Sequence, residues 1–212
     1  MTSAAGALGN DGEVSAAQRE LDELVANDPA KAALDQRLAA VIRGETPKDN
    51  RERLQLADRA YEKKLYAAST RLYAEALEAD PKLGDEREAQ HRYNAACTAA
   101  LAAASGTGPP DRKETSGRTE KTLSDADRAK FRNQARAWLE AELKAWSGLL
   151  ESAKGHKQRQ AIAGTLEHWR EDTDLASVRD KHALDSLPES ERALWKTLWA
   201  DVDRLLKKAL TP

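Results

Sequence analysis

The chain has 212 residues, of which 40% are hydrophobic and 33% are charged. This is the composition of a folded globular chain, and it excludes an intrinsically disordered or membrane-embedded protein. The 34 Lys and Arg residues nearly balance the 36 Asp and Glu residues, which argues against a dedicated nucleic-acid binder.

The first residues show no targeting signal. They contain neither a basic segment nor an apolar stretch, so a signal peptide is not expected, and no window has the apolar length that a bilayer requires. A single cysteine excludes an internal disulfide and implies no oxidising compartment. We expect a cytoplasmic protein that binds neither nucleic acid nor membrane, with residues 1–14 disordered.

Residues 15–46 predict an N-terminal pair of helices. Ser15 can cap the first helix, with Gln18 as its capping-box partner. Asp28 and Pro29 form a typical cap and first position for the second helix, and Gly44 is the expected stop.

Residues 47–105 predict three more helices. Asp49 and Glu52 form a capping pair for a helix that extends to about residue 64. A second helix is expected over residues 66–79, where Asp80 and Pro81 end it. A third, rich in alanine, is expected over residues 84–105, with Cys97 packed as a small apolar side chain.

Residues 106–122 predict a flexible loop, because this stretch has no large apolar residue that could hold it on a core. A solvated insert is the simpler interpretation, and a phosphorylatable or docking segment is the alternative. Deleting the loop should leave the fold nearly intact.

The remaining residues predict further helices. Ser124 and Asp127 can cap a long helix to about residue 153, and Gly155 separates it from a helix to about residue 169. Residues 172–185 are expected to form an irregular connector that includes one short helical turn. Pro188 opens a last, strongly amphipathic helix. We therefore predict an all-α fold of about eight helices.

Residues 53–81 also match much of the tetratricopeptide pattern. In this pattern small residues let two antiparallel helices approach closely, and an aromatic residue fills the gap above them. Leu56 and Ala57 take the Leu-Gly positions, Ser69 is the small crossing residue and Tyr73 is the aromatic. The pattern favours an antiparallel helix-pair stack over residues 47–212, a tetratricopeptide-like superhelix, with a Trp-rich helical cap at its C-terminal end.

Several longer strings carry a more specific resemblance. The chain resembles the tetratricopeptide-like C-terminal region of planctomycete-type bacterial serine/threonine protein kinases in KLYAASTRLYAEALEADPKL, HRYNAACTAALAAASG, ARAWLEAELKAW, LEHWREDTDLASVRD and ALWKTLWADVDRLL. In that family the region follows a kinase domain and mediates protein contacts. The glycine-rich loop, the His-Arg-Asp loop and the Asp-Phe-Gly motif of a kinase are absent from this sequence, so kinase activity is not implied.

The resemblance also implies a partner-binding groove on the first helix of each pair. The groove-facing positions are Arg51, Leu54, Asp58, Tyr61, Glu62, Gln90, Tyr93, Asn94 and Cys97. Tetratricopeptide domains that bind chaperone tails clamp a carboxylate with Lys and Asn. Here Leu54 and Asp58 stand at such positions and only Asn94 matches, so a chaperone tail is an unexpected ligand. The alternative is that these residues simply cover the core.

No arrangement of residues predicts catalysis. The four histidines are scattered and none has metal-ligand spacing, so we expect no enzyme activity, no metal and no cofactor. The tryptophans after residue 137 favour core packing, with an exposed patch for a partner as the alternative.

Three hypotheses for function follow. The first is a non-catalytic protein-interaction or scaffold module that binds a protein or peptide as a monomer or weak homodimer. The second is a regulatory or docking segment of a kinase signalling system. The third is an all-α hydrolase or ligand-binding protein with a pocket walled by Trp138, Trp169 and Trp195, which a solid tryptophan core would remove.

Overall fold

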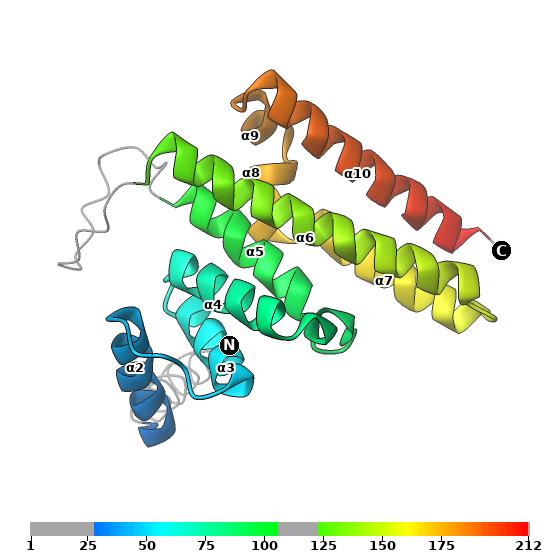
Figure 1. Ribbon diagram of the computed structural model, residues 1–212. Coiled ribbons are helices and arrows are strands. Elements are labelled where there is room, and N and C mark those ends of the chain that lie inside the picture. Colours follow the sequence, from blue (N-terminus) through cyan, green and yellow to red (C-terminus); the bar gives the residue numbers. More distant parts are fainter. Residues whose placement is uncertain (1–27, 106–122, 212) are drawn as a thin grey trace, which may run out of the picture. The chain divides into compact units, whose positions relative to one another are not determined.

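The computed structural model in Figure 1 describes residues 28–105 and 123–211. The chain divides into two compact units, Met1–Thr46 and Pro47–Pro212. The predicted disorder of residues 1–14, the first helix of the predicted pair and the predicted loop over residues 106–122 lie outside the described residues.

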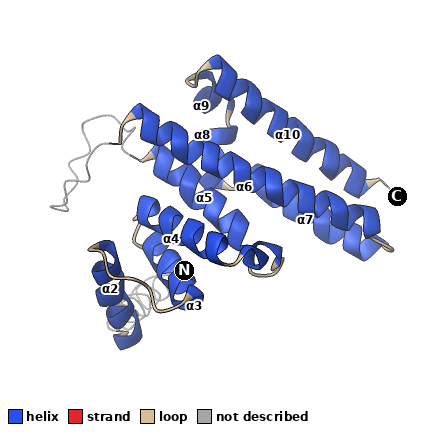
Figure 2. Ribbon diagram, viewed as in Figure 1, coloured by secondary structure: helices blue, strands red, loops and turns tan. Residues whose placement is uncertain are grey.

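Every regular element of the described residues is a helix, which confirms the all-α prediction (Figure 2). The helices are α2 (Pro29–Ile42), α3 (Asn50–Glu62), α4 (Tyr66–Ala79), η1 (Pro81–Asp85), α5 (His91–Ala104), α6 (Asp125–Ser152), α7 (His156–Glu171), η2 (Thr173–Leu175), α8 (Ala176–Arg179), α9 (Lys181–Asp185) and α10 (Glu189–Leu210).

The first unit contains α2, whose predicted ends are confirmed. The Asp28 side chain accepts a hydrogen bond from the backbone N–H of Ala30 at 2.9 Å. Gly44 follows the helix with φ of +116°, a conformation that favours glycine. Arg37 contacts the segment after the helix, since it donates to Glu45 at 2.6 Å and to the carbonyl of Thr46 at 2.8 Å.

In the second unit, α3 and α4 form a closely packed hairpin. The predicted cap is present, with the backbone N–H of Glu52 donating to Asp49 at 2.8 Å. Ala57 and Ala60 are fully buried. The hydroxyl of buried Ser69 on α4 donates to the Ala57 carbonyl at 2.8 Å. These small residues let the two helix backbones come close.

Helix α5 begins later than predicted. The sequence predicted a helix from residue 84, but η1 and a turn occupy residues 81–90, and Gln90 has a left-handed φ of 52°. Gly84 lies against Arg92, because a Cβ at position 84 would come within 1.9 Å of the Arg92 guanidinium. Arg87 and Arg92 both bind Glu142 of α6, so long-range ion pairs hold this turn against its local helical tendency.

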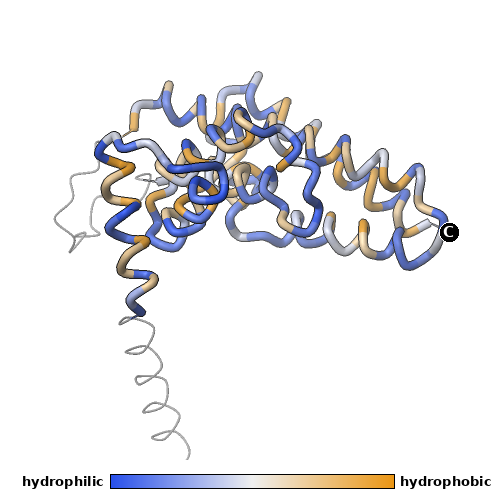
Figure 3. The backbone as a smooth tube through the Cα atoms, turned by 60° about the horizontal axis from the view of Figure 1, so that its bottom comes forward, coloured by the Kyte–Doolittle hydropathy of each residue, from blue (hydrophilic) through white to orange (hydrophobic). Residues whose placement is uncertain are grey.

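Helices α6, α7 and α10 are longer and pack with larger side chains. Their amphipathic pattern is visible in Figure 3, where orange and blue stretches alternate along the helices near the C-terminus. The predicted cap of α6 is confirmed by the hydrogen bond from the Asp127 N–H to the Ser124 hydroxyl at 3.1 Å. The prediction of an irregular connector over residues 172–185 was wrong, because this segment folds as three short helices, η2, α8 and α9.

The tryptophans pack largely inside the second unit. Trp169 and Trp195 are fully buried, and Trp138 is 8% exposed. Trp199 donates its indole N–H to the Val178 carbonyl at 2.8 Å and so fixes α10 against α8. These side chains form a core under the short connecting helices.

Candidate functional site

A pocket of about 520 Å³ lies between α3, α5 and the C-terminal end of α7. Of the groove positions implied by the resemblance, the pocket is lined by Asp58, Tyr61, Glu62, Tyr93, Asn94 and Cys97. Three others, Arg51, Leu54 and Gln90, do not line it. The structure therefore brings most of the expected groove residues of two helices into one concave surface.

The opposite wall comes from residues that the sequence did not single out. His168 is on the last turn of α7, Asp172 caps η2, and Thr173 and Asp174 lie within η2. Tyr73 of α4 and Thr98 of α5 complete the lining. The only sequence signal was the Asp-Thr-Asp run itself, and nothing local shows that it faces α3 and α5.

Three tyrosines of the lining each donate a hydrogen bond to a carboxylate. Tyr61 donates to Asp174 at 2.7 Å and Tyr93 donates to Asp172 at 2.6 Å. Tyr73 donates to Asp58. Each of the three hydroxyl protons is therefore donated to an acidic side chain. The bond between Tyr61 and Asp174 joins α3 to η2, more than a hundred residues apart in the sequence.

These contacts raise the pKa of the phenols well above the ordinary value of 10. For Tyr61 the main cause is the hydrogen bond to Asp174, because the carboxylate disfavours a phenolate beside it. For Tyr73 and Tyr93 burial is the main cause, and the carboxylate partners add to it. The hydroxyls thus remain donors to the aspartates.

Tyr93 is also fixed by aromatic contacts. Its ring stacks on the buried ring of Trp169 at a centroid distance of 5.3 Å and an interplanar angle of 16°. The imidazole of His168 also lies against the Tyr93 ring, at a centroid distance of 5.7 Å and an interplanar angle of 53°. Stacking of this kind gives the pocket a rigid aromatic floor.

Arg179 of α8 holds the turn that carries the acidic wall. Its Nη1 donates to the Trp169 carbonyl at 3.2 Å and to the Asp172 carbonyl at 2.6 Å. The Asp172 side chain in turn accepts from the Asp174 N–H at 2.9 Å. The carboxylates of this wall are therefore positioned by hydrogen bonds behind the pocket surface.

Cys97 lies at the base of the pocket, with its Sγ 3.8 Å from the Asp172 carboxylate. The same carboxylate is 3.5 Å from Nε2 of His168. Burial raises the pKa of the thiol well above its ordinary range, and the negative charges of Asp172 and Asp174 add to this effect. A nucleophilic cysteine needs the opposite shift, because the thiolate is the reactive species.

The pocket lining is acidic. It contains the carboxylates of Asp58, Glu62, Asp172 and Asp174, whereas His168 is its only basic side chain among the lining residues. Burial raises the pKa of Asp174, and the nearby charge of Asp172 adds to the effect, while the Tyr61 hydroxyl and His168 oppose it. A negative potential is thus concentrated at this surface.

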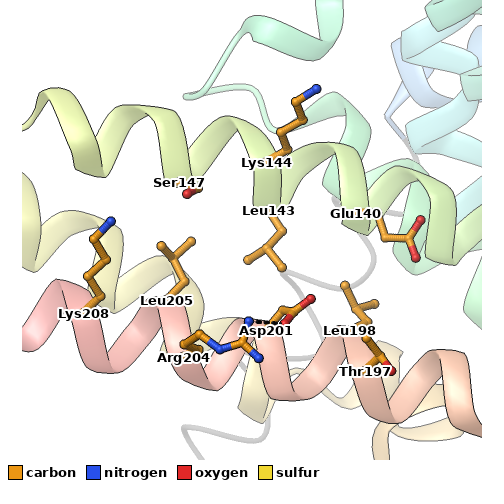
Figure 4. A pocket seen from close by; sticks show the side chains of 10 residues that line it. All are labelled: Glu140, Leu143, Lys144, Ser147, Thr197, Leu198, Asp201, Arg204, Leu205 and Lys208. Carbon is orange, nitrogen blue, oxygen red and sulfur yellow. Dashed lines mark hydrogen bonds and ion pairs between the residues drawn. The ribbon is translucent and has the colours of Figure 1, made fainter.

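A second hollow, of about 480 Å³, lies between α6 and α10 (Figure 4). Leu143, Leu198 and Leu205 point into the space between the two helices. Its rim carries both signs of charge, from Glu140, Lys144, Asp201, Arg204 and Lys208. This mixed rim gives no preference for a ligand of either sign.

Trp138, Trp169 and Trp195 do not line either hollow. A smaller hollow of about 210 Å³ lies beside Trp146, Leu149 and Ile162, and it contains none of the three either. The hypothesis of a pocket walled by those three tryptophans therefore receives no support from the hollows described.

The comparisons with known proteins identify no relative. No protein-family model, no curated protein and no solved structure gives a significant match to the chain. Within residues 28–105 and 123–211, no helix combines the length and apolarity needed to cross a membrane. The same residues contain no group of three or more His, Cys, Asp or Glu side chains arranged to hold a metal ion.

Proposed function

We propose that the chain is a non-catalytic protein-interaction module that binds a peptide segment of a partner in the tyrosine pocket, the hollow lined by Asp58, Tyr61, Tyr93, Asp172 and Asp174. The observation that carries the proposal is the convergence of the groove positions of α3 and α5 on one hollow of about 520 Å³. The resemblance assigned these positions to partner binding, independently of the pocket.

The exposed side chains of the pocket support a binding role, whereas Tyr73, Tyr93, Cys97 and Thr98 also belong to the buried core. Tyr61 is 39% exposed and Asp58 and Glu62 are also exposed, so the apolar core does not need them. Tyrosine gives a large contact area with a polar tip, and it is enriched in the residues that dominate binding energy. The hydrogen bonds to aspartates pre-organise the rings, which lowers the entropy cost of binding.

The chemistry of Cys97 supports a non-catalytic role. The thiol, His168 and Asp172 are close together, but the raised pKa keeps the sulfur protonated. A general base must also reach the proton that it abstracts. Here Nε2 of His168 contacts the Asp172 carboxylate, and the Cys97 thiol faces the same carboxylate rather than the imidazole.

The proposal includes a tetratricopeptide-like arrangement. In it, α3 with α4 and α5 with the first half of α6 are successive antiparallel pairs, and the Trp-rich helices α7 to α10 close the stack as a cap. The resemblance to the kinase C-terminal region adds the prediction that the module acts in serine/threonine kinase signalling in a bacterial cytoplasm.

A peptide array tests the binding role. The full chain is incubated with an array of overlapping peptides of about nine residues, which span roughly 30 Å when extended. Wild type is compared with Asp58→Arg/Tyr61→Ala and with the control Asp203→Arg/Leu149→Ala, which makes the same kinds of change at exposed positions of α10 and α6. We expect peptides that bind wild type and the control but not the pocket variant. Equal binding by all three folded proteins would place any binding elsewhere, and no binding by wild type would overturn the proposal.

A further inference from the structure

The tyrosine pocket has a charge balance that differs from that of the other acidic side chains that face a neighbouring element. Glu142 is paired with Arg87 and Arg92, Glu191 with Arg132, and Asp203 with Arg170. Within the described residues, by contrast, Asp58, Asp172 and Asp174 form no ion pair with a Lys or Arg side chain, and the one basic side chain within ion-pair distance of them is the imidazole of His168, beside Asp172. Asp172 and Asp174 are partly buried, and such carboxylates are normally compensated by a cation, so these two lack a partner that the fold supplies elsewhere.

The hydrogen bonds of the pocket tyrosines also favour a positively charged ligand. The hydroxyl protons of Tyr61, Tyr73 and Tyr93 are all donated to aspartates, so the oxygens that remain available at these groups are acceptors. A ligand that contacts these tyrosine–aspartate pairs must therefore bring the donors. Ammonium and guanidinium groups carry donors and a positive charge together, and neither has an acceptor.

The exposed ring of Tyr61 favours a flat or extended cation. Tyr61 is 39% exposed and lines the pocket, and the π face of an aromatic ring attracts cations, whereas the Tyr93 ring is buried against Trp169 and His168. Arginine suits such a site best, because its planar guanidinium can stack on an aromatic ring while it forms a fork of hydrogen bonds to a carboxylate. The hollow is also large enough for more than one side chain of an extended peptide.

We infer that the peptide bound in the tyrosine pocket is basic, and that an arginine side chain lies between Asp58 on α3 and Asp174 on η2. This inference rests on the proposed function and deepens it by naming the chemistry of the partner. Glu62 at the rim is already paired with Arg59, so it contributes to the negative potential rather than to the direct contact.

The test uses the full chain and calorimetric titration with four matched peptides. The first alternates glycine and serine with three arginines, and the others replace arginine by lysine, by uncharged citrulline or by glutamate. Citrulline keeps the planar shape of arginine and three of its five N–H donors, but a carbonyl oxygen replaces one nitrogen group and the charge is lost. At about 50 mM salt, where screening is weak, we expect the arginine peptide to bind at least about tenfold more tightly than the citrulline peptide.

The matched variants locate the contact. Asp58→Asn/Asp174→Asn keeps an oxygen acceptor for each tyrosine but removes two negative charges. Glu189→Gln/Asp203→Asn removes the same charge from α10. We expect the pocket variant to weaken arginine binding at least about tenfold and the α10 variant to leave it within about twofold, with both folded by circular dichroism.

The outcomes separate the two proposals. Equal binding of arginine and citrulline peptides, or preferred binding of the glutamate peptide, overturns the basic-ligand inference but leaves a peptide-binding module. Equal loss in both variants also overturns it, because the attraction is then general to the chain. If spermidine binds the pocket while neither these peptides nor the array peptides do, the site takes a free polyamine and both proposals fail.

Discussion

The side chains that pack helices α3 to α5 together differ in size from those that pack helices α6, α7 and α10. The buried face of α5 consists mainly of alanine, with Tyr93, Cys97 and Thr98 among them. The buried face of α10 consists of Trp195, Leu198, Val202, Leu205, Leu206 and Ala209. Small residues let helix backbones approach closely, whereas large residues fill the space between helices whose backbones lie further apart.

The two regions also treat charge differently. Between the C-terminal helices, Arg170 faces Asp203 at 3.0 Å, and Glu191 of α10 binds Arg132 of α6. In the tyrosine pocket the aspartates have tyrosine partners rather than cationic ones. Under our proposal the C-terminal helices serve stability, while the carboxylates at the edge of α3 and α5 serve the binding of a ligand. The predictions below test this contrast.

Trp195→Ala should cause the largest loss of stability. Its ring is fully buried, so truncation leaves a large cavity and should lower the free energy of unfolding by about 3–5 kcal/mol. Urea denaturation measures this change. Trp195→Phe is the matched variant and should cost much less, because the indole N–H has no hydrogen-bond partner within the described residues. A loss under about 1 kcal/mol for the alanine variant would show that the Trp core is not solid.

Glu142→Ala should follow in size. The Glu142 side chain is only 4% exposed and binds both Arg87 and Arg92, so its removal leaves two partly buried cations without their partner. We expect a loss of about 3 kcal/mol in the free energy of unfolding. Glu140 lies two residues before Glu142, but it is exposed and paired with Arg136. Glu140→Ala should therefore lower the free energy of unfolding by less than about 1 kcal/mol. Similar losses for the two variants would contradict the role given to the buried ion pairs.

Asp174→Asn should slightly increase the free energy of unfolding at neutral pH. Because burial raises the pKa of Asp174, the folded state holds this proton at pH values where the unfolded carboxyl has lost it. The carboxyl therefore lowers the stability of wild type as pH rises through the raised pKa. The asparagine variant should become more stable than wild type by less than about 1 kcal/mol at neutral pH, with no gain in acid, where both forms are neutral. Parallel denaturation series from about pH 3 to about pH 7 measure the difference. A loss of stability in the asparagine variant at neutral pH would show that the charge serves the fold.

Replacing residues 106–122 with a Gly-Ser linker should have the smallest effect. Arg128 of α6 donates to the carbonyls of Ala103 at 2.9 Å and of Ser105 at 2.5 Å, so the two ends of the connection are joined by contacts outside it. Halving its length should stabilise the protein by about 0.6 kcal/mol through a lower loop-closure cost. A drop in melting temperature of more than about 5 °C would indicate that the segment packs on the core.

The features that the sequence predicted well depend on neighbouring residues. The caps at Asp28, Asp49 and Ser124 are local, because a side chain a few residues away satisfies a backbone N–H. Helix periodicity is equally local, which is why the all-α class could be inferred.

The features that it missed depend on contacts between distant residues. The late start of α5 reflects the binding of Arg87 and Arg92 to Glu142, about fifty residues away. The second wall of the pocket has the same origin, since Asp172 and Asp174 reach Tyr93 and Tyr61 only after η2 packs on α5. Groove positions on α3 and α5 were implied by a repeat pattern, which carries no information about what faces them.

Hydrogen–deuterium exchange of the full chain with and without the arginine peptide tests the central claim most directly, because it reads both regions at once. The account predicts slower exchange in the C-terminal half of α3, in α5 and in the η2 turn at Asp172–Asp174, with α6 and α10 unchanged around Leu143 and Leu205. Protection confined to the α6–α10 hollow would contradict it and would move the binding surface to the C-terminal helices.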